Sequence, residues 1–329
     1  MIYNNVLSMI GGTPVLKLEL KNGWELYLKM EMYNPGRSMK DRMALNMIAD
    51  AEERGLLKYG GTIVESSSGN TAISLAIVSV IRGYKFIAVV DHHASIEKIN
   101  TIKAYGGKIV YVKGKYAKGR VAVAEREKLA EKISKKKLNS FFPAQADNFS
   151  NRESYIDTMA KEILDEIPVF DYLFGSIGTS GSLCGTAIGI KKSNKNIKVV
   201  AVEPVGSIIF GGKAGPYFQS GTGNPAGADI PKIIDFDVID ENCYATDQEA
   251  FDTCRYLAKN KGIMVGGSAG GVVFNAVKLA SQKKGPGKIV VIIPDGGEKY
   301  VSTIFNDGWI KRNKLSEPKN CKFLKENII

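Results

Sequence analysis

The feature that most constrains the fold of this chain is the alternation of short β-branched runs with longer segments of helical periodicity. The runs are rich in Val, Ile and aromatic residues: GTIVES (61–66), YKFIAVVD (84–91), GKIVYV (107–112), KVVAVEP (198–204) and KIVVIIPD (288–295). Between them, apolar residues repeat every three to four positions, as in MKDRMALNMIADAEERGLL (39–57) and NTAISLAIVSVIRG (70–83). Apolar strands alternating with helices are typical of parallel sheets covered on both faces. The sequence therefore predicts an α/β fold with mostly parallel sheets.

The length and composition of the chain suggest two lobes. A chain of 329 residues, of which 44% are hydrophobic, can bury more than one core. No internal repeat, low-complexity block or long linker divides it, so we expect the lobes to share the chain discontinuously. Residues 1–39 plus 146–329 are predicted to form the larger lobe, and residues 40–145 the smaller one.

Composition also argues against a membrane protein, disulfide bonds and a metal site. No apolar run reaches the roughly 18 to 20 residues of a membrane span, and the N-terminus lacks a basic region followed by an apolar core. We therefore expect a cytoplasmic protein that binds no membrane. The four cysteines form no CxxC pair, and His92 and His93 are the only histidines, so we expect reduced thiols and no metal site.

The net charge of +11 comes from 45 basic and 34 acidic residues. Much of the excess lies in three runs: KGKYAKGR (113–120), EKISKKKLNS (131–140) and the segment 311–329. Such runs can bind nucleic acid, but these lack aromatic residues at a recognition spacing. We expect a solvated basic surface that binds no nucleic acid and attracts small anionic substrates.

Four stretches carry candidate chemistry. Lys40 lies between a glycine-containing approach and a charged exit in NPGRSMKDR (34–42). Three glycine- and serine-rich turns each join a strand to a helix: ESSSGNTAISLAI (65–77), GSIGTSGSLCGTAIGI (175–190) and MVGGSAGGVVFNAV (264–277). Backbone N–H groups at such helix starts stabilise anions. Any one of these turns alone is explained as well by helix capping.

In this order the four stretches resemble the fold-type II pyridoxal-phosphate enzymes, specifically the cysteine synthase and cystathionine β-synthase group. The resemblance runs through IGGTPVLKL, NPGRSMKDR, SSSGNTAISLA, GTSGS, GGSAGG and IIPDGGEKY, and so covers nearly the whole chain. It implies a two-lobed fold like that of tryptophan synthase β, in which the larger lobe binds the cofactor and the smaller, mobile lobe clamps the substrate. It also implies pyridoxal 5'-phosphate as cofactor and a homodimer.

The resemblance assigns roles to particular residues. Lys40 would form the Schiff base with the cofactor aldehyde and later move the α-proton as the free amine. Asn70 would contact the 3'-oxygen of the cofactor, and Ser268 its pyridine nitrogen. The phosphate cup would consist of Gly178, Thr179, Ser180, Gly181 and Ser182. The clamp for the substrate carboxylate would consist of Ser67, Ser68, Thr71 and Gln145.

These roles imply β-elimination and β-replacement in sulfur amino acid metabolism, with small amino acids as substrates. The cofactor ring would hold the charge left by the α-proton, and the β-substituent would leave to give an aminoacrylate. A neutral hydroxyl at Ser268, instead of a carboxylate, favours elimination over transamination. The donor would be L-cysteine, which releases H₂S and gives serine or a thioether amino acid, or an O-activated serine.

Asp229, in the loop SGTGNPAGADIPK (220–232), bears on the choice of donor. By position it resembles a family residue that faces the β-carbon. A carboxylate there would repel phosphate and could act as a general base toward water or a thiol, which favours L-cysteine over phosphoserine. The simpler interpretation is that Asp229 is an exposed aspartate in a turn, without a catalytic role.

Other features leave alternatives open. The stretches SGS (180–182) and VDHH (90–93) depart from the usual cysteine synthase pattern, and GSIIFG (206–211) resembles siderophore-pathway synthases that join phosphoserine to glutamate. A nucleotide-binding oxidoreductase would also use glycine-rich turns, although the chain lacks GxGxxG after its first strand. A non-catalytic paralogue is the third alternative. We expect His92 and His93 to be loop residues near the entrance, and Asp295 and Tyr300 to serve in packing or loop anchoring near the presumed pyridine ring.

Overall fold

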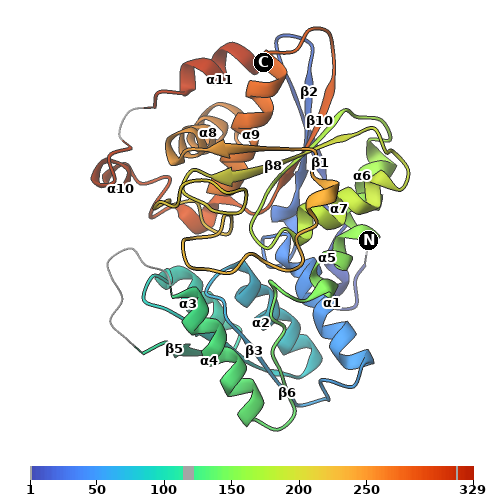
Figure 1. Ribbon diagram of the computed structural model, residues 1–329, viewed down its shortest axis with the longest axis vertical. Coiled ribbons are helices and arrows are strands. Elements are labelled where there is room, and N and C mark those ends of the chain that lie inside the picture. Colours follow the sequence, from blue (N-terminus) through green and yellow to red (C-terminus); the bar gives the residue numbers. More distant parts are fainter. Residues whose placement is uncertain (1, 114–121, 316–317) are drawn as a thin grey trace.

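The computed structural model describes residues 2–113, 122–315 and 318–329, which hold a six-stranded and a four-stranded sheet (Figure 1). The larger sheet has the order β1 (Val15–Glu19), β2 (Glu25–Met30), β10 (Lys288–Ile293), β7 (Tyr172–Ser176), β8 (Lys198–Pro204), β9 (Glu241–Ala245). The smaller has the order β5 (Lys108–Tyr111), β4 (Lys85–Val90), β3 (Thr62–Glu65), β6 (Ser140–Phe141). Every pairing is parallel except that of β1 with β2. The prediction of an α/β fold with mostly parallel sheets is confirmed.

Strand β10 shows why the large sheet needs helices on both faces. Its alternate residues Ile289, Val291 and Ile293 pack into one core, and Val290 and Ile292 pack into another. The first core is closed by α8 (Asp247–Lys261), α9 (Gly267–Ser281) and α11 (Cys321–Asn327), and the second by α5 (Phe149–Ile156), α6 (Met159–Glu166) and α7 (Gly181–Lys191). An uninterrupted apolar strand therefore marks a sheet without a solvated face.

The small sheet is covered in the same way. Ile63 of β3 faces a core shared with α2 (Asn70–Arg82) and α3 (Ile96–Ala104), whereas Val64 faces α4 (Val123–Lys136). Both residues are fully buried. The remaining short helices are η1 (Val6–Met9), η2 (Glu31–Tyr33), η3 (Phe236–Val238), η4 (Gly297–Tyr300) and α10 (Asp307–Arg312).

Helix α1 (Lys40–Glu53) lies between the two sheets (Figure 1). Met43 and Met47 pack with the core of α5, α6 and α7, whereas Ala44 and Ile48 pack with the core of the small sheet. A division of the chain at residue 40 therefore falls at the start of a helix that belongs to both cores. Lys40, its first residue, lies where the two parts of the molecule meet.

A buried ionic cluster ties the N-terminal segment to α1 and α6. The Arg42 guanidinium donates to Glu31 at 2.8 Å and to Glu162 at 2.7 Å, and Lys29 lies 2.8 Å from Glu162. The Thr13 hydroxyl donates to Glu31 at 2.6 Å. Buried charges require such pairing, and the fixed geometry of these pairs selects one placement of α1.

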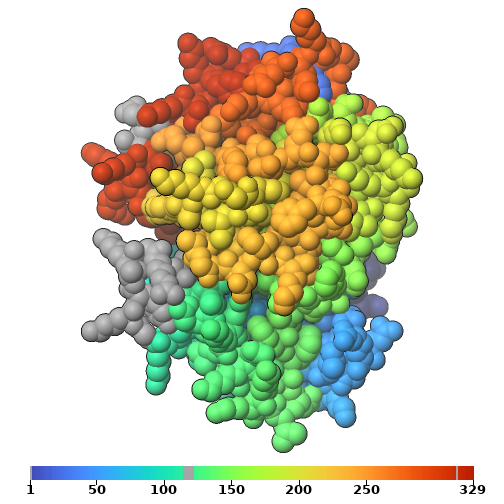
Figure 2. All heavy atoms as spheres, viewed as in Figure 1, coloured from blue at the N-terminus to red at the C-terminus, as the bar shows by residue number. Residues whose placement is uncertain are grey.

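Two of the basic runs predicted to lie on the surface extend beyond the residues that the structure describes. Most of the basic run 113–120 and part of the segment 311–329 lie outside them. Among the described helices, none is long and apolar enough to cross a membrane. In the space-filling view the yellow and orange surface of the large part adjoins the green surface of the small part (Figure 2). The Lys232 ammonium pairs with Asp147 at 2.9 Å.

Candidate active site

Lys40 is held at the junction of the two parts by its neighbours in the chain. The Met39 N–H donates to the Pro294 carbonyl at 2.9 Å, and the Tyr155 hydroxyl donates to the Met39 carbonyl at 3.0 Å. The Lys40 side chain is half-buried, and burial lowers the pKa of its ammonium to about 8, although the carboxylate of Asp295 acts in the opposite direction. A lysine with such a pKa has a usable neutral fraction near pH 7, which a nucleophile or a proton acceptor needs.

The turn between β3 and α2 offers unpaired donors. The Gly69 N–H donates to the Ser67 hydroxyl at 3.2 Å. No described residue accepts a hydrogen bond from the backbone N–H groups of Ser67, Ser68, Asn70 or Thr71. These groups lie at the start of a 13-residue helix, where the helix dipole also favours an anion. The geometry suits a carboxylate.

The fourth predicted clamp residue lies beside this turn. The Thr71 hydroxyl donates to the Gln145 side-chain oxygen at 2.7 Å, across 74 positions of sequence. Beneath them lies a residue that sequence reasoning missed. The fully buried carboxyl of Glu65 accepts from the Ser66 N–H at 2.7 Å and from the Gln145 N–H at 3.4 Å, and burial raises its pKa to about 8. Its place directly before the serine run was the only signal in the sequence.

The turn between β7 and α7 forms the predicted phosphate cup, Gly178 to Ser182. Ser180 has a left-handed backbone (φ 67°), which turns successive N–H groups toward one side. Within the described chain, no acceptor takes a hydrogen bond from the backbone N–H groups of residues 178–182. A Cβ on Gly178 would lie 3.3 Å from the Gly221 carbonyl oxygen, so the backbone at Gly221 packs closely against this turn. Open amides, three hydroxyls and the start of an 11-residue helix fit a phosphate group.

Asn151 of α5 connects the cup with the clamp. Its side chain is fully buried and donates to the Gln145 carbonyl at 2.7 Å and to the Thr179 hydroxyl at 3.5 Å. The same side chain packs so closely on Gly181 that a Cβ there would overlap it. Asn151 was not among the predicted site residues, because nothing in its local sequence marks it.

Ser268, the predicted partner of the pyridine nitrogen, is the second residue of α9 and is buried. Asp295 lies beside this helix start, since a Cβ on Gly266 would overlap the Asp295 carboxylate. The Asp295 side chain accepts from the Tyr300 hydroxyl at 2.7 Å and from the Asn70 amide nitrogen at 2.8 Å. Asp295 therefore joins the Ser268 region to Asn70, which goes beyond the predicted packing or loop anchoring.

Asp229 lies on an exposed loop at the edge of this region. Its backbone carbonyl accepts from the Asn224 amide at 2.9 Å, and no described contact joins its carboxylate to Lys40. His92 and His93 lie in the exposed loop after β4 with their rings 4.1 Å apart, which confirms their prediction as loop residues. Among the described residues no group of His, Cys, Asp and Glu is placed to hold a metal ion, and the four cysteines are free.

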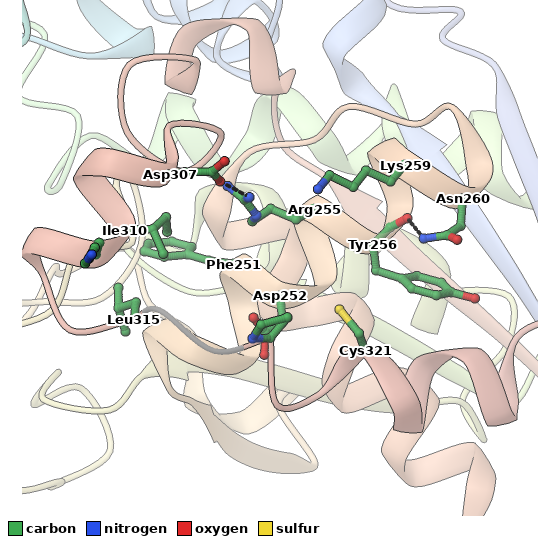
Figure 3. Close-up of a pocket in the computed structure, with 12 residues that line it drawn as sticks. Phe251, Asp252, Arg255, Tyr256, Lys259, Asn260, Asp307, Ile310, Leu315 and Cys321 are labelled. Atoms are coloured by element: carbon green, nitrogen blue, oxygen red, sulfur yellow. Dashed lines mark hydrogen bonds and ion pairs between the residues drawn. The ribbon is translucent and has the colours of Figure 1, made fainter.

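Two cavities have no predicted site residue in their walls. One of about 310 Å³ lies between α8 and residues 307–315 and 318–321, with Arg255 turned toward Asp307 in its wall (Figure 3). Another, of about 260 Å³, is lined by residues 35–37, Lys98 and Lys299. The chemistry predicted from the sequence therefore lies in neither cavity, and in the first Arg255 is paired with Asp307. The region around Lys40 is therefore the candidate active site.

A sequence profile of the family described as "Pyridoxal-phosphate dependent enzyme" matches residues 6–295, which span Lys40 and all three turns. This chain belongs to that family. The pyridoxal-phosphate enzyme described here is 43% identical over 322 residues to a "Putative cysteine synthase" of Sinorhizobium fredii, with 97% of this chain and 95% of the relative covered. It is 37% identical to the "O-ureido-L-serine synthase" of Streptomyces lavendulae, with 93% and 94% covered.

Solved structures agree with these relatives. The crystal structure of a hydrogen sulfide-producing enzyme from Fusobacterium nucleatum matches with a TM-score of 0.85 and 34% identity, over 91% of this chain and 98% of that one. The fold-type II family and the cofactor predicted from the sequence are confirmed, as is the general class of β-elimination and β-replacement in sulfur amino acid metabolism. The family assignment excludes the nucleotide-binding oxidoreductase. When bound, pyridoxal 5'-phosphate supplies an aldehyde that a lysine amine can attack and a ring that holds negative charge.

Proposed function

We propose that this enzyme uses L-cysteine as donor and releases its sulfur as hydrogen sulfide. The relative from Fusobacterium nucleatum, whose name describes hydrogen sulfide production, supports this donor. Water would replace the sulfur to give serine, or the thiol of a second amino acid would replace it to give a thioether. The Cβ–Sγ bond of cysteine breaks, a Cβ–O or Cβ–S bond forms, and the proton of the incoming nucleophile ends on the leaving sulfide.

The observation that carries the proposal is the acidic rim formed by Glu127, Asp147 and Asp229. Burial raises the pKa of Glu127, the neighbouring Arg126 guanidinium lowers it, and the carboxylates of Asp147 and Asp229 raise it, so these charged groups lie near one another. Asp147 is paired with Lys232 and Arg126 is paired with Asp91, which leaves the rim with a negative balance. A negative rim repels a phosphorylated donor and attracts the ammonium of a second amino acid.

We assign the steps on the protein side to residues of the two helix starts. The open amides of Ser67 to Thr71, with Gln145, would hold the substrate carboxylate. Lys40 would take the α-proton as the neutral amine, which its lowered pKa makes accessible near pH 7. Asp229 would take the proton of the attacking water or thiol, or hold the second ammonium.

The test compares the wild type with Asp229→Asn on L-cysteine, O-acetylserine and phosphoserine in turn, with sulfide and amino acid products measured. We expect the wild type to release sulfide from L-cysteine. We also expect the variant to form product about 100-fold more slowly, since general base catalysis typically contributes that much. Asp157→Asn is a matched control, because the Asp157 side chain is 89% exposed and its only described partner is the exposed Lys192.

Three outcomes would overturn the assignment. Equal rates for the wild type and Asp229→Asn would show that the loop has no catalytic role. A wild-type preference for phosphoserine would favour the siderophore-type synthase that joins phosphoserine to glutamate. Absence of turnover with every donor, in cofactor-loaded protein, would favour the non-catalytic paralogue.

We also propose that the enzyme is a cytoplasmic homodimer that acts on small amino acids and binds neither membranes nor nucleic acid. The support for the dimer is the family resemblance, and that for the compartment is the composition of the sequence. Mass measurement in solution checks the dimer, and cell fractionation checks the compartment. A monomeric mass or a membrane-bound fraction would contradict these assignments.

A further inference from the structure

The Asn70 amide is held at both ends by side chains of the segment that follows β10. Its nitrogen donates to the Asp295 carboxylate at 2.8 Å, and its oxygen accepts from the Lys299 ammonium at 2.7 Å. These contacts join residues 225 and 229 positions apart, so they form only in the folded chain. Asn70 is the first residue of α2, and Lys299 lies in η4.

The chemistry of the two partners allows one orientation of this amide. An ammonium can only donate hydrogen bonds, and a carboxylate can only accept them. If the amide turned over, its NH₂ would face Lys299 and its oxygen would face Asp295, with both contacts repulsive. The orientation, which is usually ambiguous for asparagine, is therefore determined by its neighbours.

Lys299 is itself fixed. Its ammonium donates to the carbonyl oxygens of Gly36 and Arg37, both at 3.1 Å, in addition to Asn70. These three acceptors use all the hydrogens of the group. Since Gly36 and Arg37 belong to the stretch that leads to Lys40, Lys299 connects that stretch with the start of α2. Asp295 at the other end is 1% exposed and also bonded to Tyr300.

An amide nitrogen carries two hydrogens, and Asp295 accepts only one of those on Asn70. We propose that Lys299 is a positioning residue for the cofactor. Together with Asp295 it locks the Asn70 amide, so that the second hydrogen stays available to the ring oxygen of the cofactor bound at Lys40. This inference rests on the predicted contact between Asn70 and that oxygen. It does not depend on the identity of the donor amino acid.

The experiment is a double-mutant cycle on cofactor binding by the full-length protein, without substrate. Asn70→Ala, Lys299→Met, the double variant and Lys299→Arg are stripped of cofactor and titrated with pyridoxal 5'-phosphate. The dissociation constant and the position of the cofactor absorbance band are recorded. Lys322→Met, at a side chain that is 86% exposed, is the control for a lost lysine charge. Thermal unfolding of each cofactor-free variant verifies that it is folded.

If Lys299 acts through Asn70, each single variant weakens cofactor binding by about tenfold, the value of one hydrogen bond to a charged group. The double variant then binds as weakly as either single one, with the same shift of the absorbance band. Lys299→Arg, which keeps a cationic donor, stays within about twofold of the wild type.

Three results overturn the inference. A double variant about 100-fold weaker than the wild type would show that the two residues act independently. Wild-type binding by Lys299→Met would show no role for Lys299. Wild-type binding by Asn70→Ala would remove the contact on which the inference depends. Failure to release sulfide from L-cysteine would contradict the proposed donor and leave this cycle unaffected.

Discussion

At the scale of single residues, burial and one carboxylate set the protonation of Lys40. Burial lowers its pKa from 10.5 to about 8, and Asp295 partly opposes this change. At pH 7 about one lysine in ten is then neutral, against about one in 3,000 for an ordinary lysine. We expect the rate at which cofactor-free protein binds pyridoxal 5'-phosphate to rise about tenfold per pH unit up to about pH 8, and to level off above it. Rapid-mixing absorbance across this range measures the profile.

The Asp295→Asn variant tests the cause of that profile. Removing the carboxylate removes the interaction that favours the charged amine, so the midpoint should move to lower pH. The exposed Asp157→Asn change should leave it where it is in the wild type. A midpoint near the ordinary lysine value, or one that rises in Asp295→Asn, would show that the environment of Lys40 is misinterpreted.

Single residues also show the limit of sequence reasoning. Lys40 and the serine, threonine and glycine donors were predictable, because their chemistry needs short motifs at strand-to-helix turns. Lys299, Glu65 and Asn151 were not, because their roles arise from contacts across 28 to 229 positions. Lysines, glutamates and asparagines of ordinary appearance acquire such roles only when folding brings distant turns together.

At the scale of elements, close approach of α5 and α7 sets the position of the predicted phosphate cup. Gly181, Gly185 and Gly189 lie on one face of α7, four residues apart. A Cβ on Gly185 would overlap the Arg152 carbonyl oxygen of α5, and one on Gly189 would overlap that of Ile156. The stripe lets the two backbones touch, which places Asn151 against the first turn of α7.

A methyl group on this stripe should therefore be costly. We expect Gly185→Ala to destabilise the protein by about 1 to 3 kcal/mol through overpacking against a backbone atom that cannot move away. Gly308→Ala in the exposed helix α10 is the matched control. The added methyl group meets only side-chain atoms, at 3.2 and 3.4 Å, and should change the free energy of unfolding by less than about 1 kcal/mol. Thermal unfolding measures both, and equal effects would contradict the role of the stripe.

The same scale explains which elements could be predicted. Strands β3, β4, β5, β8 and β10 are apolar runs bounded by turns, and each forms within the run that predicts it. The pairing of β1 with β2 was not predicted. Strand β1 lies at the edge of the sheet, where Leu16 is exposed, and its sequence therefore resembles a polar segment. Strand order depends on contacts that no local pattern contains.

At the scale of the whole molecule, side chains of the small part contact the large part beside the candidate active site. Lys98 of α3 is one of them, since its ammonium donates to the Ser220 hydroxyl at 3.3 Å and lies 4.8 Å from the centre of the Tyr300 ring. Its side chain is buried, and burial lowers its pKa, with Asp295 in opposition. Ser220 begins the loop that carries Asp229, so Lys98 couples the small part to that loop.

We expect Lys98→Met to favour an open arrangement of the two lobes by about fivefold, because a partly buried cation–π contact contributes about 1 kcal/mol. Residues 40–145 would then move as the mobile lobe that the sequence suggests. Hydrogen exchange should become faster at α3 and at residues 219–224, and the Michaelis constant of the amino acid substrate should rise by a similar factor.

Lys103→Met, at an exposed position of the same helix, is the matched control. A variant that lost activity with unchanged exchange at both segments would place Lys98 in the chemistry and not in closure. Faster exchange at α3 alone would mean that the loop bearing Asp229 is held by the large lobe without help from Lys98.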